Sequence, residues 1–365
     1  MGNIIDYVEN KMESLNTKEF NAVDSLILSV LSYIRFENIV PLLSERKAPV
    51  RFGELLKSEL FESMFNNLWD MESYRRIFFA FAASPRFRNT YLNFYTSISD
   101  PVLDKQFSAV TFLLEDKSAY IAYRGTDSTF VGWKEDFNMA YMSTVPAQEE
   151  GAKYLNMVAG EIPEVNKLRA GGHSKGGNIV VYAAMNCDPS VQKRIDMVYN
   201  HDGPGFKDNL YESPEFIRIK DRIHTTLPEE ALVGMLLQHH EDYLVIKSSQ
   251  HGIIQHDPFT WIVEHDDFCY AKKIKNGALL RSKTINEWLN SINEEKRKLF
   301  IDALFQLLHQ TEYESFRELS EEWQKGAISM LSTIKNSDPE IRRFVIKTMN
   351  ELAQLSVKNL FRQNK

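Results

Sequence analysis

The stretch that decides the fold runs from Leu168 to Gly177 and reads Leu-Arg-Ala-Gly-Gly-His-Ser-Lys-Gly-Gly. Its first five residues form a short apolar run that is typical of a buried strand, and a helix is predicted from Gly176 to about Met185. Between them stands the pattern G-x-S-x-G, and a strand before this pattern with a helix after it is the context of a nucleophile elbow. The pattern therefore predicts that Ser174 lies on a sharp turn, with its hydroxyl raised above the end of the strand.

Strands and helices alternate on both sides of this turn. Residues 107–114 and 119–123 predict a hairpin upstream, and residues 195–200, 222–227 and 243–248 predict three strands downstream. Alternation of this kind is typical of an α/β fold, with a mostly parallel central sheet flanked by helices.

The 365 residues divide into three predicted parts. Residues 1–100 are expected to be mainly helical, residues 101–270 hold the α/β core with the elbow, and residues 271–365 form an additional C-terminal helical region. Of the 16 glycines, 12 lie between Gly125 and Gly252, so the tight turns are expected in the middle part.

Composition excludes several classes of protein. The net charge of −7 argues against a nucleic-acid partner, since such proteins usually carry a basic field. The apolar runs are shorter than the ~18–20 residues of a membrane span, so no integral membrane association is expected. Two cysteines make no disulfide framework and no zinc spacing is present, so neither a metal nor another cofactor is expected. With no secretory leader at the start, a cytoplasmic location is the simplest expectation.

A nucleophilic serine needs a general base, and a neutral imidazole usually serves. In proteins with a nucleophile elbow the chain order is serine, acid, histidine. His251 and His256 both follow the last predicted strand. We favour His256, because Asp257 and Pro258 can start a helix and hold the loop; His251 is the second choice.

The acid is less well defined by the sequence. Asp202 follows the predicted strand at 195–200, so it is expected at the same edge of the sheet as Ser174. Glu229 and Glu230, after the next predicted strand, are the alternatives. An Asp-Gly pair such as Asp202-Gly203 also occurs simply as a turn.

An oxyanion that forms at the site would need two hydrogen-bond donors. One is expected from the backbone N–H of Lys175, the residue after the nucleophile. The other is expected from the loop after an early strand, and Thr126 follows the predicted strand at 119–123. Its backbone N–H is the candidate, with its hydroxyl as an additional donor.

These motifs resemble those of a known family. Tyr123–Thr126 with Trp133 and Asp136 resembles the F-R-G-T … W … D element of class 3 (fungal-type) lipases, and residues 172–177 resemble their G-H-S-L-G-G. Residues 202–206 (D-G-P-G-F) and 255–261 (Q-H-D-P-F-x-W) resemble a bacterial lipase-like branch, formerly a domain of unknown function. The resemblance covers roughly residues 20–270. It implies the α/β-hydrolase fold, Ser174 as nucleophile, Thr126 in an oxyanion hole and His256 as base.

The sequence departs from that family at two places. Lys175 replaces the usual apolar residue after the serine, and a cation there would favour anionic or polar substrates. Class 3 lipases take their acid from a D-x-V-P loop, but the corresponding residues 228–234 contain no aspartate. That leaves Asp202, or a glutamate substitute.

The leading hypothesis is a lipase-like or esterase-like serine hydrolase. Ser174, His256 and Asp202 would cleave a carboxylic ester or thioester through an acyl-enzyme, and the substrate would be a small acyl ester or a lipid-like ester. The alternative is a catalytically silent lipase-like protein that binds a partner through its helical C-terminus. An acyltransferase or a peptidase with the same triad is a third reading. The C-terminal helices could cap the site, form a homo-oligomer or hold a protein partner.

Overall fold

The computed structural model describes residues 2–45, 47–66, 68–237, 241–311, 313, 323–336 and 339–363. Within these ranges, nine strands form one central sheet in the order β1-β2-β3-β4-β5-β6-β7-β8-β11. The strands are β1 (Val50–Arg51), β2 (Tyr91–Asp100), β3 (Lys105–Leu113), β4 (Ala119–Tyr123), β5 (Leu168–His173), β6 (Ile195–His201), β7 (Ile223–Pro228), β8 (Tyr243–Ile246) and β11 (Tyr270–Ala271). A separate small hairpin pairs β9 (Val263–Glu264) with β10 (Asp267–Phe268).

The sheet is mixed, which corrects the expectation of a mostly parallel one. Neighbours from β4 to β8 run parallel, as the alternation of strands and helices predicts. However, β1 to β4 are joined antiparallel, and β11 runs antiparallel to β8. The hairpin between β3 and β4 is confirmed. A short link between two strands, such as residues 114–118, allows only an antiparallel pairing.

Residues 91–100 differ from the expectation for the first hundred residues. They form β2, which pairs with β3 over its whole length, with a bulge between Asn93 and Thr96. The bulge interrupts the two-residue alternation along the strand, and this alternation is the signal that sequence reading depends on.

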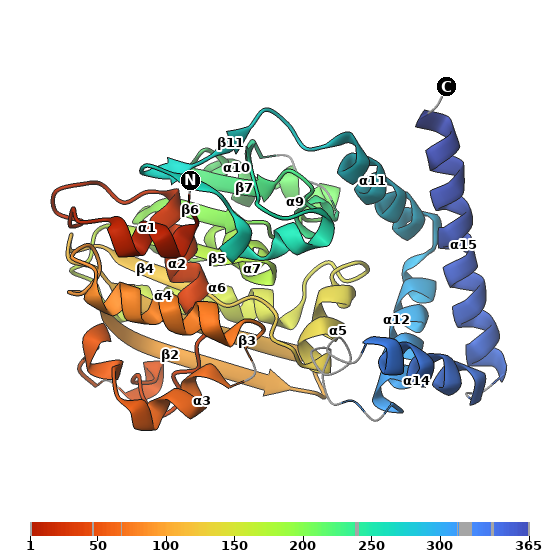
Figure 1. The fold of residues 1–365 in the computed structure, drawn as a ribbon, viewed down its shortest axis with the longest axis horizontal. Helices are drawn as coiled ribbons and strands as arrows, with labels where there is room; N and C mark the ends of the chain where they lie inside the picture. Colours follow the sequence, from red (N-terminus) through yellow and green to blue (C-terminus); the bar gives the residue numbers. More distant parts are fainter. Residues whose placement is uncertain are drawn as a thin grey trace.

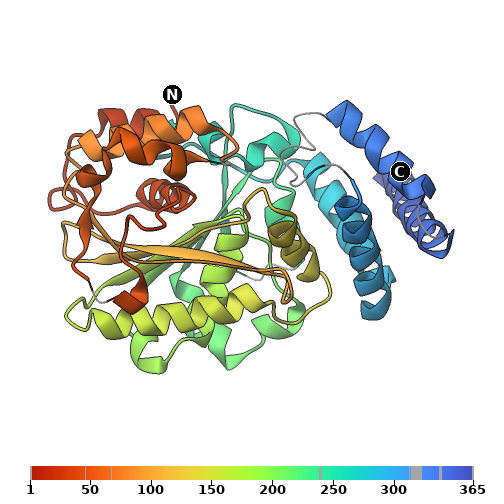
Figure 2. The same ribbon diagram turned by 90° about the horizontal axis from the view of Figure 1, so that it is seen from below.

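Helices cover both faces of the sheet, and Figure 2 shows the N-terminal helices on one side and α6 on the other. Strand β4 explains this arrangement, since it is buried along its whole length. Tyr120 and Ala122 pack with the core of the N-terminal helices, whereas Ile121 and Tyr123 pack with the core around α6 and α7. Successive side chains of a strand point to opposite faces, so one strand serves two cores.

The helices of these two layers have the following bounds. The N-terminal layer contains α1 (Ile4–Asn10), α2 (Ala22–Leu31), α3 (Phe61–Phe65) and α4 (Met71–Ala83). The rest of the body contains α5 (Phe130–Asn138), α6 (Pro146–Glu161), α7 (Lys175–Asn186), α8 (Pro189–Gln192), α9 (Asp208–Tyr211) and α10 (Pro214–Ile219). Short 3-10 turns are η1 (Leu43–Glu45), η2 (Phe52–Leu55), η3 (Ser58–Leu60), η4 (Lys220–Arg222), η5 (Val233–Met235), η6 (Gly252–His256) and η7 (Pro258–Thr260).

The C-terminal helices stand beside this body, at the right of Figure 1. They are α11 (Asn276–Ser291), α12 (Glu294–His309), α14 (Trp323–Asn336) and α15 (Pro339–Gln363). Their apolar cluster joins Trp288, Phe305 and Val345 to Phe130 at the start of α5, so α5 is one place where they meet the body. In the part of the chain that is described, no helix has both the length and the apolar character needed to cross a membrane.

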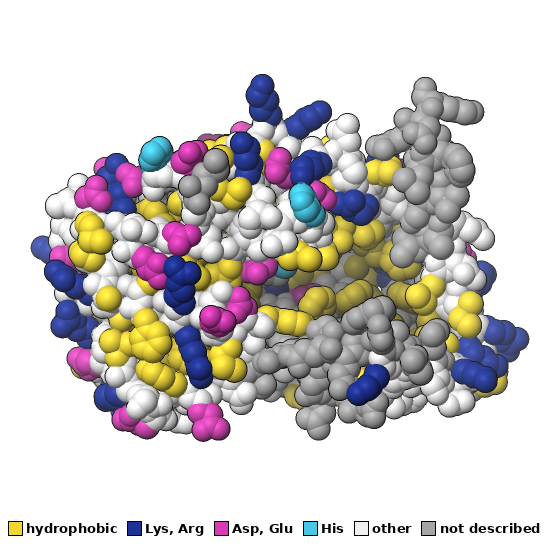
Figure 3. All heavy atoms as spheres, in the orientation of Figure 1, with side chains coloured by type: hydrophobic (Ala, Val, Ile, Leu, Met, Phe, Trp, Pro, Cys, Tyr) yellow, Lys and Arg dark blue, Asp and Glu magenta, His cyan; other side chains and the backbone are white. Residues whose placement is uncertain are grey.

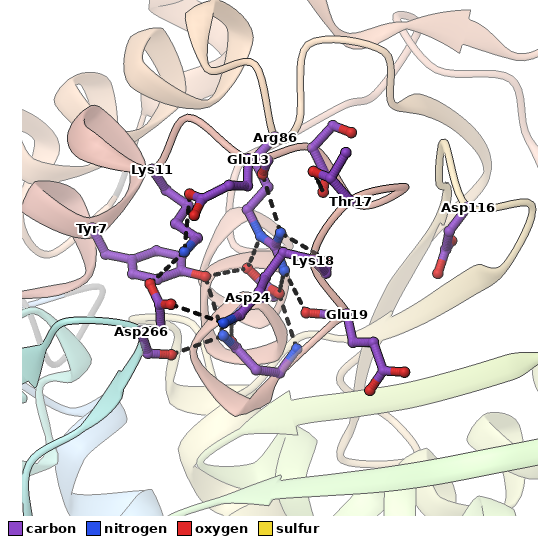
Figure 4. A network of polar contacts seen from close by, with 12 residues as sticks. Tyr7, Lys11, Glu13, Thr17, Lys18, Glu19, Asp24, Arg86, Asp116 and Asp266 are labelled. Carbon is purple, nitrogen blue, oxygen red and sulfur yellow. Dashed lines mark hydrogen bonds and ion pairs between the residues drawn. The ribbon is translucent and has the colours of Figure 1, made fainter.

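A buried ion pair ties the N-terminal segment to the body (Figure 4). Arg86 and Asp24 are both fully buried and hydrogen bonded to each other. Near this pair, Asn21 donates to the backbone carbonyl of Asp266. At the start of α1, Asn3 donates to the carbonyl of Phe259. The N-terminal residues therefore hold the segment that follows η6.

Candidate active site

The turn between β5 and α7 has the strained geometry predicted for Ser174. The residue has φ 60° and ψ −134°, a conformation that L side chains rarely adopt. Only glycine fits two positions before it and two positions after it. A Cβ at Gly172 would lie 2.3 Å from the backbone of Gly176, and one at Gly176 would lie 2.2 Å from the Tyr123 carbonyl oxygen. The strand and the helix can therefore approach closely enough to form the sharp turn.

Three side chains form a hydrogen-bonded chain at this turn. The Oγ of Ser174 lies 3.0 Å from Nε2 of His256, and Nδ1 of His256 lies 2.6 Å from Oδ2 of Asp202. An ionised carboxylate only accepts hydrogen bonds, so Nδ1 carries the proton and Nε2 accepts from the serine. Serine, imidazole and carboxylate thus meet in this order, although the two contacting pairs are 82 and 54 positions apart in the sequence.

Asp202 comes from the end of β6 and is fully buried. Its backbone is in the left-handed region, with φ 50°, and its N–H donates to the carbonyl of Thr226 on β7. Its second carboxylate oxygen, Oδ1, accepts from the N–H of Gly234 at 3.1 Å. These contacts fix the carboxylate toward His256, which is about one quarter exposed.

The side chain of His173 contacts His256 and helps to position its imidazole ring, a role that sequence reasoning missed. Its Nε2 lies 2.8 Å from the carbonyl oxygen of His256, and its ring lies 4.7 Å from the His256 ring. Burial lowers the pKa of His173 well below its ordinary value, so the ring is neutral. Nε2 donates, and Nδ1 is left to accept from the Tyr33 hydroxyl at 3.3 Å. His173 matches the histidine of the G-H-S-L-G-G motif, but the match does not indicate which groups its side chain contacts.

Thr126 lies in the loop between β4 and α5, next to the turn. A Cβ at Gly125 would meet the carbonyl oxygen of His173 at 2.6 Å, which shows how closely this loop approaches the end of β5. The Thr126 hydroxyl donates to Oδ2 of Asp136 on α5. Lys175 is the first residue of α7, where a helix leaves backbone N–H groups without an intrahelical acceptor.

The side chain of Lys175 corrects one expectation. It is only 1% exposed, and its Nζ lies 3.0 Å from Oε2 of the fully buried Glu135. A cation that is buried and paired in this way offers no charge to an incoming substrate. The prediction that Lys175 would favour anionic or polar substrates is therefore wrong.

The alternative acids, Glu229 and Glu230, and the alternative base, His251, have partners outside the chain of Ser174, His256 and Asp202. Glu230 pairs with Lys275 at 3.0 Å and with Arg281 at 3.3 Å, and Glu229 lies 4.0 Å from Lys275. His251 is 87% exposed and lies 3.8 Å from Glu230. Among the described residues, the carboxylate hydrogen bonded to the His256 ring is that of Asp202.

No group of three or more His, Cys, Asp or Glu side chains in the described part of the chain is arranged to hold a metal ion.

Comparison with known proteins identifies the family. The Mbeg1-like family matches residues 81–306, which is more than half of the chain, so the protein belongs to the Mbeg1-like family. No curated protein matches the sequence.

Among solved structures, the M37 lipase matches with 14% identity and a TM-score of 0.38, over 60% of this chain and 70% of the lipase. The Rhizomucor miehei lipase in its propeptide complex matches with 15% identity and a TM-score of 0.31, over 46% of this chain and 66% of that chain.

Proposed function

We propose that this protein is a lipase-like serine hydrolase with the α/β-hydrolase fold, which cleaves carboxylic esters or thioesters. The observation that carries the proposal is the hydrogen-bonded chain from Ser174 through His256 to Asp202, with heavy-atom distances of 3.0 and 2.6 Å. This order and spacing are those of a serine nucleophile, a general base and an orienting acid.

The proposed reaction has two stages. His256 takes the proton of Ser174 as the serine oxygen attacks the acyl carbonyl, and then returns it to the leaving alcohol or thiol. The acyl-enzyme is then hydrolysed by a water molecule that His256 deprotonates. Asp202 keeps the proton on Nδ1 of His256 and stabilises the imidazolium that forms at each stage.

The tetrahedral oxyanion would be stabilised by two backbone N–H groups. One belongs to Lys175, at the positive end of α7, and the other to Thr126. The hydrogen bond from the Thr126 hydroxyl to Asp136 would hold this second donor in place. Preorganised donors of this kind need no reorientation as the charge develops.

A lipophilic acyl group is the proposed substrate feature. Figure 3 shows a hollow between the body and the C-terminal helices, and hydrophobic side chains line much of it. Beside His256, Ile253 and Ile254 are more than half exposed. We propose that this hollow leads to Ser174 and receives the acyl group, since exposed apolar surface is typical of sites that bind apolar ligands.

Two segments near Ser174 also contact the C-terminal helices. Asn286 of α11 accepts from the N–H of Leu237 and donates to the carbonyl of Met235. Met235 belongs to η5, the turn in which the N–H of Gly234 donates to Asp202. In addition, Arg297 of α12 donates to the carbonyl of Ala140, just after α5. The C-terminal helices therefore contact both the segment after Gly234 and the end of α5, and we propose that they form the outer wall of the site.

The first experiment is labelling with a fluorophosphonate probe, with the adduct located by mass spectrometry. Such a probe reacts with serines that a working base and oxyanion hole activate. We expect an adduct on Ser174, lost in Ser174→Ala, together with hydrolysis of p-nitrophenyl esters that rises with acyl chain length. A folded protein with neither labelling nor hydrolysis would contradict the proposal and favour a catalytically silent binding protein.

A further inference from the structure

The side chain of Lys175 forms a buried polar cluster beside the proposed oxyanion hole. Its Nζ lies 3.0 Å from Oε2 of Glu135, 2.8 Å from Oε1 of Gln106 and 3.1 Å from the Gln106 carbonyl oxygen. Lys175 is 1% exposed and Glu135 is fully buried. A buried ammonium is costly unless it is paired and hydrogen bonded, and this one meets both conditions.

Glu135 links this ammonium to the surrounding elements. Its Oε2 accepts from the N–H of Gln106 on β3 at 3.0 Å, and its Oε1 accepts from the N–H of Ala147 on α6 at 2.9 Å. The pair of Lys175 and Glu135 therefore connects four elements: α7, α5, β3 and α6. Through it, the position of α5 is set relative to the turn that carries Ser174.

Asp136, the next residue of α5, connects this cluster to Thr126. Its Oδ2 accepts from the Thr126 hydroxyl. Its Oδ1 lies 3.7 Å from Nζ of Lys175 and has no hydrogen-bond donor among the described residues. The Asp136 carboxylate therefore holds the loop that contains Thr126 through one oxygen, and its other oxygen faces the Lys175 ammonium.

The charge on Asp136 depends on its neighbours. Burial raises its pKa to about 6, and the positive charge of Lys175 opposes this rise, while Glu135 and Asp127 add to it. Two further groups face the same region: Arg124, which lies 3.5 Å from Asp127, and Tyr33, whose own pKa is raised mainly by burial and also by Asp136. Removing the Lys175 ammonium would leave the three carboxylates of Glu135, Asp136 and Asp127 with Arg124 as the remaining cation.

We propose that Lys175 is a positioning residue of the proposed hydrolase: its ammonium keeps the Asp136 carboxylate ionised, so that Asp136 holds Thr126 in the oxyanion hole. The backbone N–H of Lys175 would serve one side of the hole directly, and its side chain would serve the other through Asp136. This inference rests on the proposed function.

The test compares the pH profile of kcat for a p-nitrophenyl ester in the wild type and Lys175→Met. A misplaced oxyanion donor costs about 10- to 100-fold in rate. We expect that loss in kcat at pH 7 with KM within about threefold. The rate requires a neutral His256 and, if the proposal holds, an ionised Asp136 as well, so a higher Asp136 pKa moves the acidic limb of the profile to higher pH. Asp136→Asn, introduced into Lys175→Met, is expected to abolish this shift, because the titrating group is gone.

A matched control variant is available on α5, the helix that carries Asp136. Lys134 on α5 pairs with Asp104 and Asp302 at 3.0 and 3.2 Å, away from Asp136. Lys134→Met removes a paired ammonium and is expected to leave the acidic limb in place. Lys175→Met leaves the buried Glu135 carboxylate without its cation. The double variant Lys175→Met with Glu135→Gln is therefore measured as well, because losing both partners of a buried pair is better tolerated than losing one.

A second readout does not depend on activity. The ¹³C NMR signal of the Asp136 carboxyl, assigned by its loss in Asp136→Asn, should titrate near pH 6 in the wild type and at higher pH in Lys175→Met. An unchanged titration and an unchanged acidic limb would overturn the role of Lys175 while leaving the hydrolase proposal intact. A wild type that neither reacts with a fluorophosphonate nor cleaves esters would overturn the hydrolase proposal, and the positioning role with it.

Discussion

Two buried charge clusters in this protein differ in how completely their polar atoms are satisfied. In the cluster around Arg86, all three guanidinium nitrogens donate, to Asp24 and to the carbonyls of Glu13, Lys18 and Glu19. In the cluster around Lys175, Asp136 keeps one carboxylate oxygen without a donor among the described residues, and its pKa is raised to about 6.

The difference indicates that one cluster has a structural role and the other a functional role. A saturated cluster holds segments together, and here it joins the N-terminal residues to α2 and to the chain after α4. A cluster with an unsatisfied carboxylate, beside a strained serine, retains a group that can change its charge near neutral pH, and such groups are concentrated at functional sites. We therefore expect changes in the first cluster to affect stability and changes near the second to affect rate.

The largest expected effect is on rate, in Asp202→Asn. An amide does not hold the proton on Nδ1 of His256, so kcat should fall by about 10⁴-fold, equivalent to about 5.5 kcal/mol. Steady-state kinetics and fluorophosphonate labelling measure this loss, and thermal unfolding should show a folded protein. Retention of more than a tenth of the activity would mean that Asp202 is not the acid.

The next effect is on stability, in Arg86→Met. The variant leaves the buried Asp24 carboxylate without its cation, which costs about 3–5 kcal/mol when one partner of a buried pair is removed. Denaturant unfolding measures the loss, and kcat of the protein that remains folded should stay within about twofold. A large fall in kcat without a loss of stability would contradict the distinction between the two clusters.

A smaller effect on rate is expected in Thr126→Val. The backbone N–H remains, but Asp136 loses the hydroxyl that it holds, so the loop that carries the proposed oxyanion donor is less well positioned. We expect kcat to fall about 10-fold, equivalent to about 1.4 kcal/mol, with a smaller change in KM. Thr126→Ser, which keeps the hydroxyl, is the matched control and should retain most of the activity.

The smallest effect is expected in Glu230→Gln. This carboxylate pairs with Lys275 and Arg281 near the surface and has no hydrogen bond to His256 among those described. Kinetic parameters should stay within about twofold, since such ion pairs contribute little. Loss of activity here, combined with an active Asp202→Asn, would transfer the role of acid to Glu230.

Much of the fold was accessible from the sequence, because its signals are local. The runs at 168–172 and 195–200 are strands, the run at 243–248 is a strand over residues 243–246, and a helix follows the G-x-S-x-G turn. The antiparallel part of the sheet was harder. Strand β2 is recognised only through its pairing with β3, and its bulge hides the alternation.

The candidate site was accessible in part for the same reason. The position of Ser174 follows from glycines within five residues, whose small size permits the turn. His256 could be ranked above His251 from the Asp257-Pro258 pair that follows it, whereas the chain order fits both histidines equally. The contacts of the His173 and Lys175 side chains could not be predicted from the motif, since they are made with elements that are distant in the sequence.

The sequence alone therefore determined the strained turn at Ser174 and the alternation of strands and helices around it, because steric limits and periodicity act between neighbours in the chain. The tertiary structure decided which carboxylate meets His256 and where the Lys175 charge goes. Those outcomes depend on burial and on groups up to 69 residues apart, such as Lys175 and Gln106, whose distances only the packed fold sets.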